Sequence, residues 1–216
     1  MTPFTDIPSP DAHLSLIYQD AWLLAVDKPA GLLSVPGRGA DKQDCLSARL
    51  QQVFPEAQVV HRLDMATSGL MLFARGAEMQ RELSRMFRER LIEKQYVAVV
   101  TGRVATETGS VDLPVIADWP NRPRQRVDRT AGKPALTHYR VLHDGDAVTG
   151  TRLALQPVTG RTHQLRVHLA ALGHPIIGDA LYGGCAAERL LLHAERLRFN
   201  HPASSETITL HSPAPF

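Results

Sequence analysis

His61-Arg62-Leu63-Asp64-Met65-Ala66-Thr67-Ser68-Gly69-Leu70 is the stretch around which the rest of the chain is best understood. It places an acid close to a base, continues with the turn-forming residues 67–69, and then opens an apolar run over 70–74 that is typical of a buried strand. An Arg and an Asp two positions apart on an extended segment share a face, and most such pairs are ordinary surface ion pairs. On this segment alone, Asp64 is either an ion-pair partner or a catalytic carboxylate.

The flanking sequence alternates short apolar runs with turn residues. Residues 44–54 predict a helix with Asp44 as its N-cap, ended by Pro55. Residues 77–90 predict an amphipathic helix, and the alternating Arg and Glu on its outer face favour a solvated surface over an RNA contact. Strands are predicted at 14–18, 22–26, 69–74, 94–100, 151–158, 190–199 and 207–210, with short β segments over 102–147.

Two further segments carry recognition chemistry. The insert 118–126 combines Trp119, Asn121 and Arg122 with two more arginines and two prolines, which suits either an RNA-facing surface or a plain exposed loop. A helix predicted to end near Gly173 has Arg161, His163 and Arg166 crowded at its N-terminal end, together with Gln164. Free backbone N–H groups and guanidinium groups would there converge on one anion-binding spot.

Composition indicates a globular protein of 216 residues, with 44% hydrophobic and 21% charged residues. No stretch approaches the ~20 apolar residues of a membrane helix, and the first ten residues lack the features of a secretory signal, so we expect a cytoplasmic protein. Cys45 and Cys185 form no metal or disulfide pattern. The net charge is only +2, but 20 of the 24 basic residues are Arg, the side chain best suited to phosphate and base contacts.

The motif patterns of several enzyme classes do not occur in this sequence. His163 and His168 lie about 140° apart around a helix, and no metal-ligand spacing appears elsewhere. The sequence has no Gly-x-Ser-x-Gly nucleophile elbow, no phosphate-binding Gly-x-x-x-x-Gly-Lys loop and no dinucleotide glycine pattern. The candidate catalytic groups that remain are a carboxylate, arginines and a tyrosine. We expect neither a metal nor an organic cofactor.

Residues 61–69 resemble the signature of the RluA-type pseudouridine synthases. Residues 27–32 resemble the first motif of that family, residues 94–96 resemble its third motif, and residues 160–168 resemble the motif after it, all in the same order and spacing. The tail segments 174–183 and 191–195 also agree with the family. Residues 33–38, 87–90 and 118–123 resemble the dual-specificity members, which act on a hairpin of 23S ribosomal RNA and on the anticodon stem-loop of certain tRNAs.

The resemblance implies roles for individual residues. Asp64 would attack the target uridine at the base or the sugar, Arg166 would pair with Asp64, and Tyr96 would stack on the uracil and share in proton transfer. Arg62 would fill the stack left by the flipped nucleotide. The expected RNA-contacting residues are Arg62, His61, Thr67, Ser68, Arg161, His163, Gln164, Trp119, Asn121 and Arg122.

The resemblance also implies an α+β fold, with a mixed, mainly antiparallel sheet flanked by helices and a central RNA cleft. We expect residues 1–12 to be a loose segment and 13–216 to form one catalytic domain of two intimately joined halves, without the S4-type domain of many relatives. A monomer with RNA as its substrate and no membrane contact is expected. The rival hypotheses are an RNA-binding or folding protein without turnover, and a metal-free hydrolase that uses Asp64.

Overall fold

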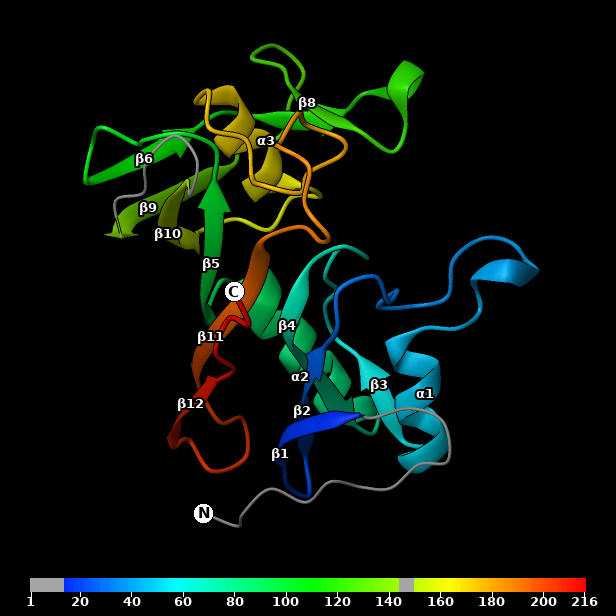
Figure 1. Ribbon diagram of the computed structural model, residues 1–216. Coiled ribbons are helices and arrows are strands. Elements are labelled where there is room, and N and C mark those ends of the chain that lie inside the picture. The colour runs from blue at the N-terminus through cyan, green and yellow to red at the C-terminus, as the bar shows by residue number, and fades with distance from the viewer. Residues whose placement is uncertain (1–13, 144–149) are drawn as a thin grey trace. The chain divides into compact units, whose positions relative to one another are not determined.

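The computed structural model describes residues 14–143 and 150–216, so the predicted loose segment 1–12 lies outside the described residues. The chain divides into two compact units, whose helices and strands are labelled in Figure 1. Unit 1 holds the chain up to Glu93 and residues 194–215, and unit 2 holds residues 94–193 and Phe216. The chain passes from one unit to the other along β5 (Glu93–Val100) and returns along β11 (Leu192–Asn200).

The sheet of unit 1 has β4 (Ser68–Arg75) near its middle, and this is the strand that follows Asp64. The hairpin of β1 (Ser15–Gln19) and β2 (Leu23–Lys28) pairs antiparallel with one edge of β4, and β3 (Ala57–Val59) also pairs with β4. The segment of β11 in unit 1 follows β4 in the strand order, and β12 (Thr207–His211) pairs antiparallel with β11.

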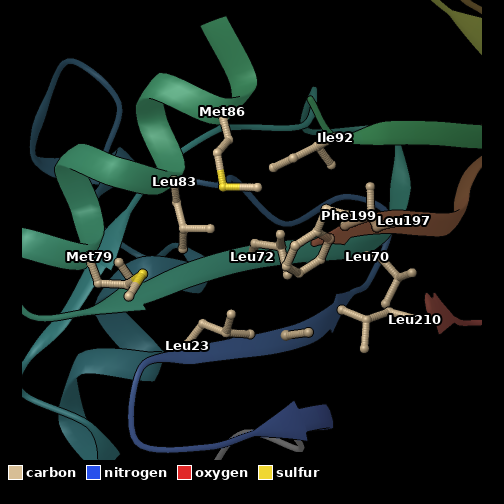
Figure 2. Packing of buried hydrophobic residues seen from close by; sticks show 12 residues of the cluster. Leu23, Leu70, Leu72, Met79, Leu83, Met86, Ile92, Leu197, Phe199 and Leu210 are labelled. Atoms are coloured by element: carbon tan, nitrogen blue, oxygen red, sulfur yellow. The ribbon is translucent and has the colours of Figure 1, made fainter. Parts of the chain in front are cut away.

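Both faces of this sheet are covered, which explains the uninterrupted apolar run over 70–74. Leu70 and Leu72 belong to one buried cluster with Leu83 and Met86 of α2 (Ala77–Arg88), and Figure 2 shows Leu70 beside Leu210 of β12. The alternate residues of β2 and β4 point to the opposite face and pack against α1 (Leu46–Val53). The strand after Asp64 is therefore a rigid base for the residues that precede it.

Gly69 is the one position of β4 at which no other residue fits. Its φ of +112° is disfavoured for residues with a side chain, and a Cβ there would lie 2.4 Å from the carbonyl oxygen of Ala194. The absence of a side chain thus allows β4 and β11 to approach closely just after the turn at residues 64–67.

Unit 2 contains an antiparallel sheet in the order β5, β10 (Thr151–Pro157), β9 (Leu136–His143) and β6 (Thr108–Asp112). A separate hairpin is formed by β7 (Val115–Ala117) and β8 (Gln125–Val127), with a 3-10 turn at Trp119–Asn121 between them. The helix α3 (Gln164–Ala171) lies against β8. The insert singled out in the sequence is thus the tip of this hairpin.

The predicted fold class, an α+β protein with a mixed, mainly antiparallel sheet, is confirmed. The predicted N-cap Asp44 is wrong by one residue: Cys45 caps α1, its sulfur accepting from the amide of Ala48 at 3.5 Å. Asp44 forms an exposed ion pair with Arg49 instead. The strand β3 was not predicted, because three residues are too few to show a period.

Candidate active site and RNA interface

The loop that carries Asp64 is held from both sides. Lys28, which is fully buried, donates from Nζ to the carbonyl oxygens of Pro29, Leu32 and Met65 at 2.7–3.0 Å. The hydroxyl of Ser34 donates to the carbonyl of Leu63 at 2.7 Å and accepts from its amide at 3.1 Å. Both neighbours of Asp64 in the chain are therefore tied to residues 28–34, the first of the motif segments.

Asp64 itself is half-buried, and its carbonyl accepts the amide of Thr67 at 3.1 Å to close a turn. Thr67 and Ser68 are almost fully buried, at 3% exposure each, which suits a role in shaping this turn, and their expected RNA contact stays a prediction. The carboxylate thus projects from a short turn whose two ends are fixed, on one side by Lys28 and Ser34 and on the other by β4. Such an arrangement pre-orients a reacting group.

The two residues before Leu63 differ in their surroundings. Arg62 is exposed, as a residue that reaches toward RNA must be. His61 is half-buried: its Nε2 accepts the amide of Leu72 at 2.8 Å, and its ring stacks on Phe87 with centroids 4.2 Å apart. These contacts give His61 a structural role in unit 1, and its expected RNA contact stays a prediction.

In unit 2, Tyr96 lies in the middle of β5, half-buried and opposite Leu155 of β10. Arg166 lies in the first turn of α3 and is 5% exposed. Its Nε and Nη2 donate to the two carboxylate oxygens of Asp179, both at 2.8 Å. The predicted anion-binding spot at this helix end therefore holds a carboxylate of the protein itself.

Asp179, the buried partner of Arg166, was not singled out from the sequence. It is 1% exposed, and its Oδ1 also accepts the amides of Leu181 and Tyr182 at 3.0 and 3.2 Å. Paired on both oxygens with a flat guanidinium, it fixes the plane of Arg166. The available signal was the Gly178-Asp179 pair in a segment already noted as family-like, but nothing in its spacing pointed to Arg166.

Gln164 was expected to contact RNA, and the structure assigns it elsewhere. It is 4% exposed, and its Oε1 accepts from Thr159 and from the amide of Arg161. Its Nε2 donates to the carbonyl of Leu136 and to the hydroxyl of Thr137, both at 3.0 Å. Every donor and acceptor of this amide is used inside unit 2, which gives Gln164 a structural role, and its expected RNA contact stays a prediction.

The same buried network continues to His168, which is fully buried. Its Nδ1 lies 2.9 Å from the Thr137 hydroxyl and its Nε2 lies 2.9 Å from the carbonyl of Leu113. Burial lowers the pKa of His168 below its ordinary value. The helix that carries Arg166 is thus anchored to β9 by polar side chains, while its Val167 packs against Val115 of β7 and Val127 of β8.

The hairpin tip presents the predicted recognition residues to solvent. Trp119 is 66% exposed, and the guanidinium of Arg122 stacks 3.0 Å from the centre of its indole ring. Asn121 is exposed and donates to Asp118 at 2.9 Å. The tip therefore offers a flat aromatic and cationic surface.

Arg161 lies outside the hairpin, close to the start of α3. It is half-buried, and its Nε donates to the carbonyl of Pro134 at 3.1 Å.

Within residues 14–143 and 150–216, no group of three or more His, Cys, Asp or Glu side chains is arranged to hold a metal ion. In that same part of the chain, no helix has the length and apolar character needed to cross a membrane.

Comparison with known proteins identifies the family. A family model described as RNA pseudouridylate synthase matches residues 22–171. The dual-specificity RNA pseudouridine synthase RluA of Escherichia coli K12 is 50% identical over 213 residues, covering 97% of both chains. The protein of the same name from Vibrio vulnificus is 49% identical over 97% of this chain and 87% of its own. The chain belongs to the RNA pseudouridine synthases.

Solved structures of other pseudouridine synthases agree with this assignment. Human RNA pseudouridylate synthase domain containing 1 superimposes with a TM-score of 0.78 at 30% identity, covering 100% of this chain and 87% of its own. Human RNA pseudouridylate synthase domain containing 4 gives a TM-score of 0.76 at 26% identity, covering 93% and 88%. The protein is therefore an RNA-modifying isomerase that converts uridine to pseudouridine. The matched family region includes Asp64, Tyr96 and Arg166 but ends before Asp179.

Proposed function

We propose that this synthase has dual specificity and modifies uridines in a 23S ribosomal RNA hairpin and in the tRNA anticodon stem-loop. The observation that carries the proposal is the 50% identity, over nearly the whole chain, to a synthase described as dual-specificity. The segments at 33–38, 87–90 and 118–123 that resemble dual-specificity members support it. The expectations of a monomer and of a cytoplasmic location stay predictions.

Asp64 is the proposed catalytic carboxylate. It opens the reaction by attacking the target nucleotide at the base or the sugar, the bond between N1 and C1′ breaks, and a bond between C5 and C1′ forms. C5 loses its hydrogen and N1 gains one, so the isomerisation needs no net water or redox partner. The support for Asp64 is its family motif and a turn held at both ends by Lys28, Ser34 and β4.

Tyr96 and Arg166 are the proposed partners of Asp64 in the reaction. Tyr96 stacks on the uracil and shares in the proton transfer from C5. Arg166 orients the carboxylate, and its guanidinium is already fixed in plane by Asp179. These assignments rest on the family motifs at 94–96 and 160–168.

RNA is held by residues at three places in the sequence. Arg62 enters the gap left by the flipped nucleotide and stacks there, which its exposure permits. The hairpin tip binds through the stacked Trp119 and Arg122, with Asn121 beside them. Arg161 and His163 flank the start of α3 and complete the proposed set.

The experiment is pseudouridine mapping on two purified RNAs, a 23S ribosomal RNA hairpin and a tRNA anticodon stem-loop. We expect the protein to form pseudouridine at one defined uridine in each, without added metal or cofactor. Modification of only one RNA would contradict dual specificity. Release of free uracil would favour the hydrolase, and binding without product would favour the RNA-binding protein.

A further inference from the structure

The hydroxyl of Tyr182 lies between the hairpin and the first turn of α3, all within unit 2. The amide of Gln125, the first residue of β8, donates to this hydroxyl at 2.7 Å. The Nδ1 of His163, the N-cap of α3, lies 2.7 Å from the same oxygen. One phenol group therefore joins the backbone of the hairpin to the start of the helix that carries Arg166.

His163 has an unusual backbone conformation for an N-cap residue. Its φ is +53°, in the left-handed region that costs a residue with a side chain about 1–2 kcal/mol. The imidazole of His163 is held by its 2.7 Å hydrogen bond with the Tyr182 hydroxyl and by the edge-to-face packing of the two rings, which lie at 88°. Arg166 follows only three residues later, so a shift of His163 is passed to the guanidinium through one helical turn.

Tyr182 also reaches Arg166 by a second route. Its backbone amide donates to the Oδ1 of Asp179, the oxygen that accepts from Nη2 of Arg166. The Arg166 guanidinium lies 5.1 Å from the centre of the Tyr182 ring, and that of Arg124, from the hairpin, lies 5.6 Å from it. Tyr182 thus contacts the β7–β8 hairpin as well as Arg166 and Asp179, the two members of the buried ion pair.

We propose that Tyr182 is a positioning residue that couples RNA binding by the hairpin to the orientation of Arg166. When Trp119 and Arg122 bind RNA, strand β8 is held in place, and with it the amide of Gln125 that donates to Tyr182. The Tyr182 hydroxyl transmits this constraint to His163 and, through it, to the Arg166–Asp179 pair. The inference rests on the proposed function, which assigns RNA binding to the hairpin and catalysis to Arg166.

A double-mutant cycle between Tyr182→Phe and Arg122→Ala tests the coupling. The first change keeps the ring and removes only the hydroxyl, and the second removes the arginine that stacks on Trp119. In the otherwise unchanged protein, we expect Arg122→Ala to weaken RNA affinity and to slow single-turnover pseudouridine formation at saturating RNA by about tenfold. In the Tyr182→Phe background it should still weaken affinity but change the saturating rate by less than about twofold.

Two controls separate coupling from loss of structure. Tyr139→Phe alters a half-buried tyrosine of β9 whose hydroxyl lies against Gly109, and it should leave the effect of Arg122→Ala unchanged. Hydrogen exchange of the Gln125 amide should accelerate in Tyr182→Phe, while the melting temperature shows that the variant remains folded. Unchanged exchange would overturn the proposed link.

The double-mutant cycle tests the coupling through Tyr182 separately from RNA binding by the hairpin. If the effects of the two substitutions on the saturating rate simply multiply, Tyr182 has a structural role only and the coupling is overturned, while the proposed function stands. If Arg122→Ala leaves RNA affinity unchanged, the hairpin is not an RNA contact, and that part of the proposed function falls together with the coupling.

Discussion

At the scale of single residues, the buried pair of Arg166 and Asp179 is the feature with the largest consequence. A bidentate guanidinium is fixed in plane as well as in position, which a lysine at the same place would not be. Both side chains are almost completely buried, so neither charge has solvent to replace its partner. Arg166 therefore needs Asp179 to keep its orientation, whatever else contacts it.

Asp179→Asn should lower the free energy of unfolding by about 3–5 kcal/mol, because it removes the buried carboxylate charge that accepts two hydrogen bonds from the buried guanidinium. Urea denaturation followed by circular dichroism measures this change. Asp44→Asn is the matched control, since it breaks a pair with Arg49 that lies in solvent, and its effect should be much smaller. Equal losses in the two variants would show that the Asp179 pair does not hold the fold of unit 2.

Residue type and spacing were enough to single out Asp64, Arg62 and Trp119, because each belongs to a motif or to an unusual local composition. They were not enough for Asp179 or Gln164. The partner of Arg166 lies 13 positions away in an irregular loop, and contacts of that kind leave no period in a sequence. Gln164 looked like an RNA contact because it sits among basic residues, yet its amide is used entirely inside unit 2.

At the scale of elements, the periodicity of apolar residues predicted where helices occur, but it predicted their first and last residues less well. The amphipathic pattern over 77–90 predicted α2 correctly, and its residues Met79, Leu83 and Met86, which are four and three apart, are buried in the core. The helix predicted to end near Gly173 ends at Ala171 in α3, and Leu172 beyond it is 39% exposed. Buried polar residues hold that helix in addition to apolar ones, and the polar network ending at His168 is not visible in an apolar pattern.

The buried His168 makes the anchoring of α3 depend on pH. Its pKa in the folded protein is lowered by burial, so as pH falls the unfolded chain takes up the proton first. This contribution to stability should be complete above about pH 6.5, fall as the pH drops from there toward the lower folded pKa, and level off below it.

Urea denaturation between pH 7.5 and 5.5 measures this slope. His168→Gln removes the titrating group and should flatten the curve in this range. His138→Gln, at an exposed position of β9, should leave the slope as it is. A slope that survives in His168→Gln would assign the pH dependence to another group.

At the scale of the whole molecule, the proposed catalytic and binding residues are spread over both units of the chain. Asp64 and Arg62 belong to unit 1, while Tyr96, Arg166 and the hairpin belong to unit 2. Net charge is too small to have indicated RNA as the substrate, and the family assignment came from ordered motifs and overall identity. Phosphate contacts from several separate arginines would supply most of the affinity, so loss of one catalytic carboxylate should leave RNA binding largely intact.

The most direct test of the account is single-turnover pseudouridine formation by Asp64→Asn on a tRNA anticodon stem-loop, measured alongside RNA affinity. Asp41→Asn, an exposed carboxylate of the same unit, is the matched control and should behave as the unchanged protein. We predict that Asp64→Asn lowers the rate by about a thousandfold or more, while its affinity for RNA stays within about tenfold. Pseudouridine formed by Asp64→Asn at the rate of the unchanged protein would contradict the assignment of Asp64 as the catalytic carboxylate.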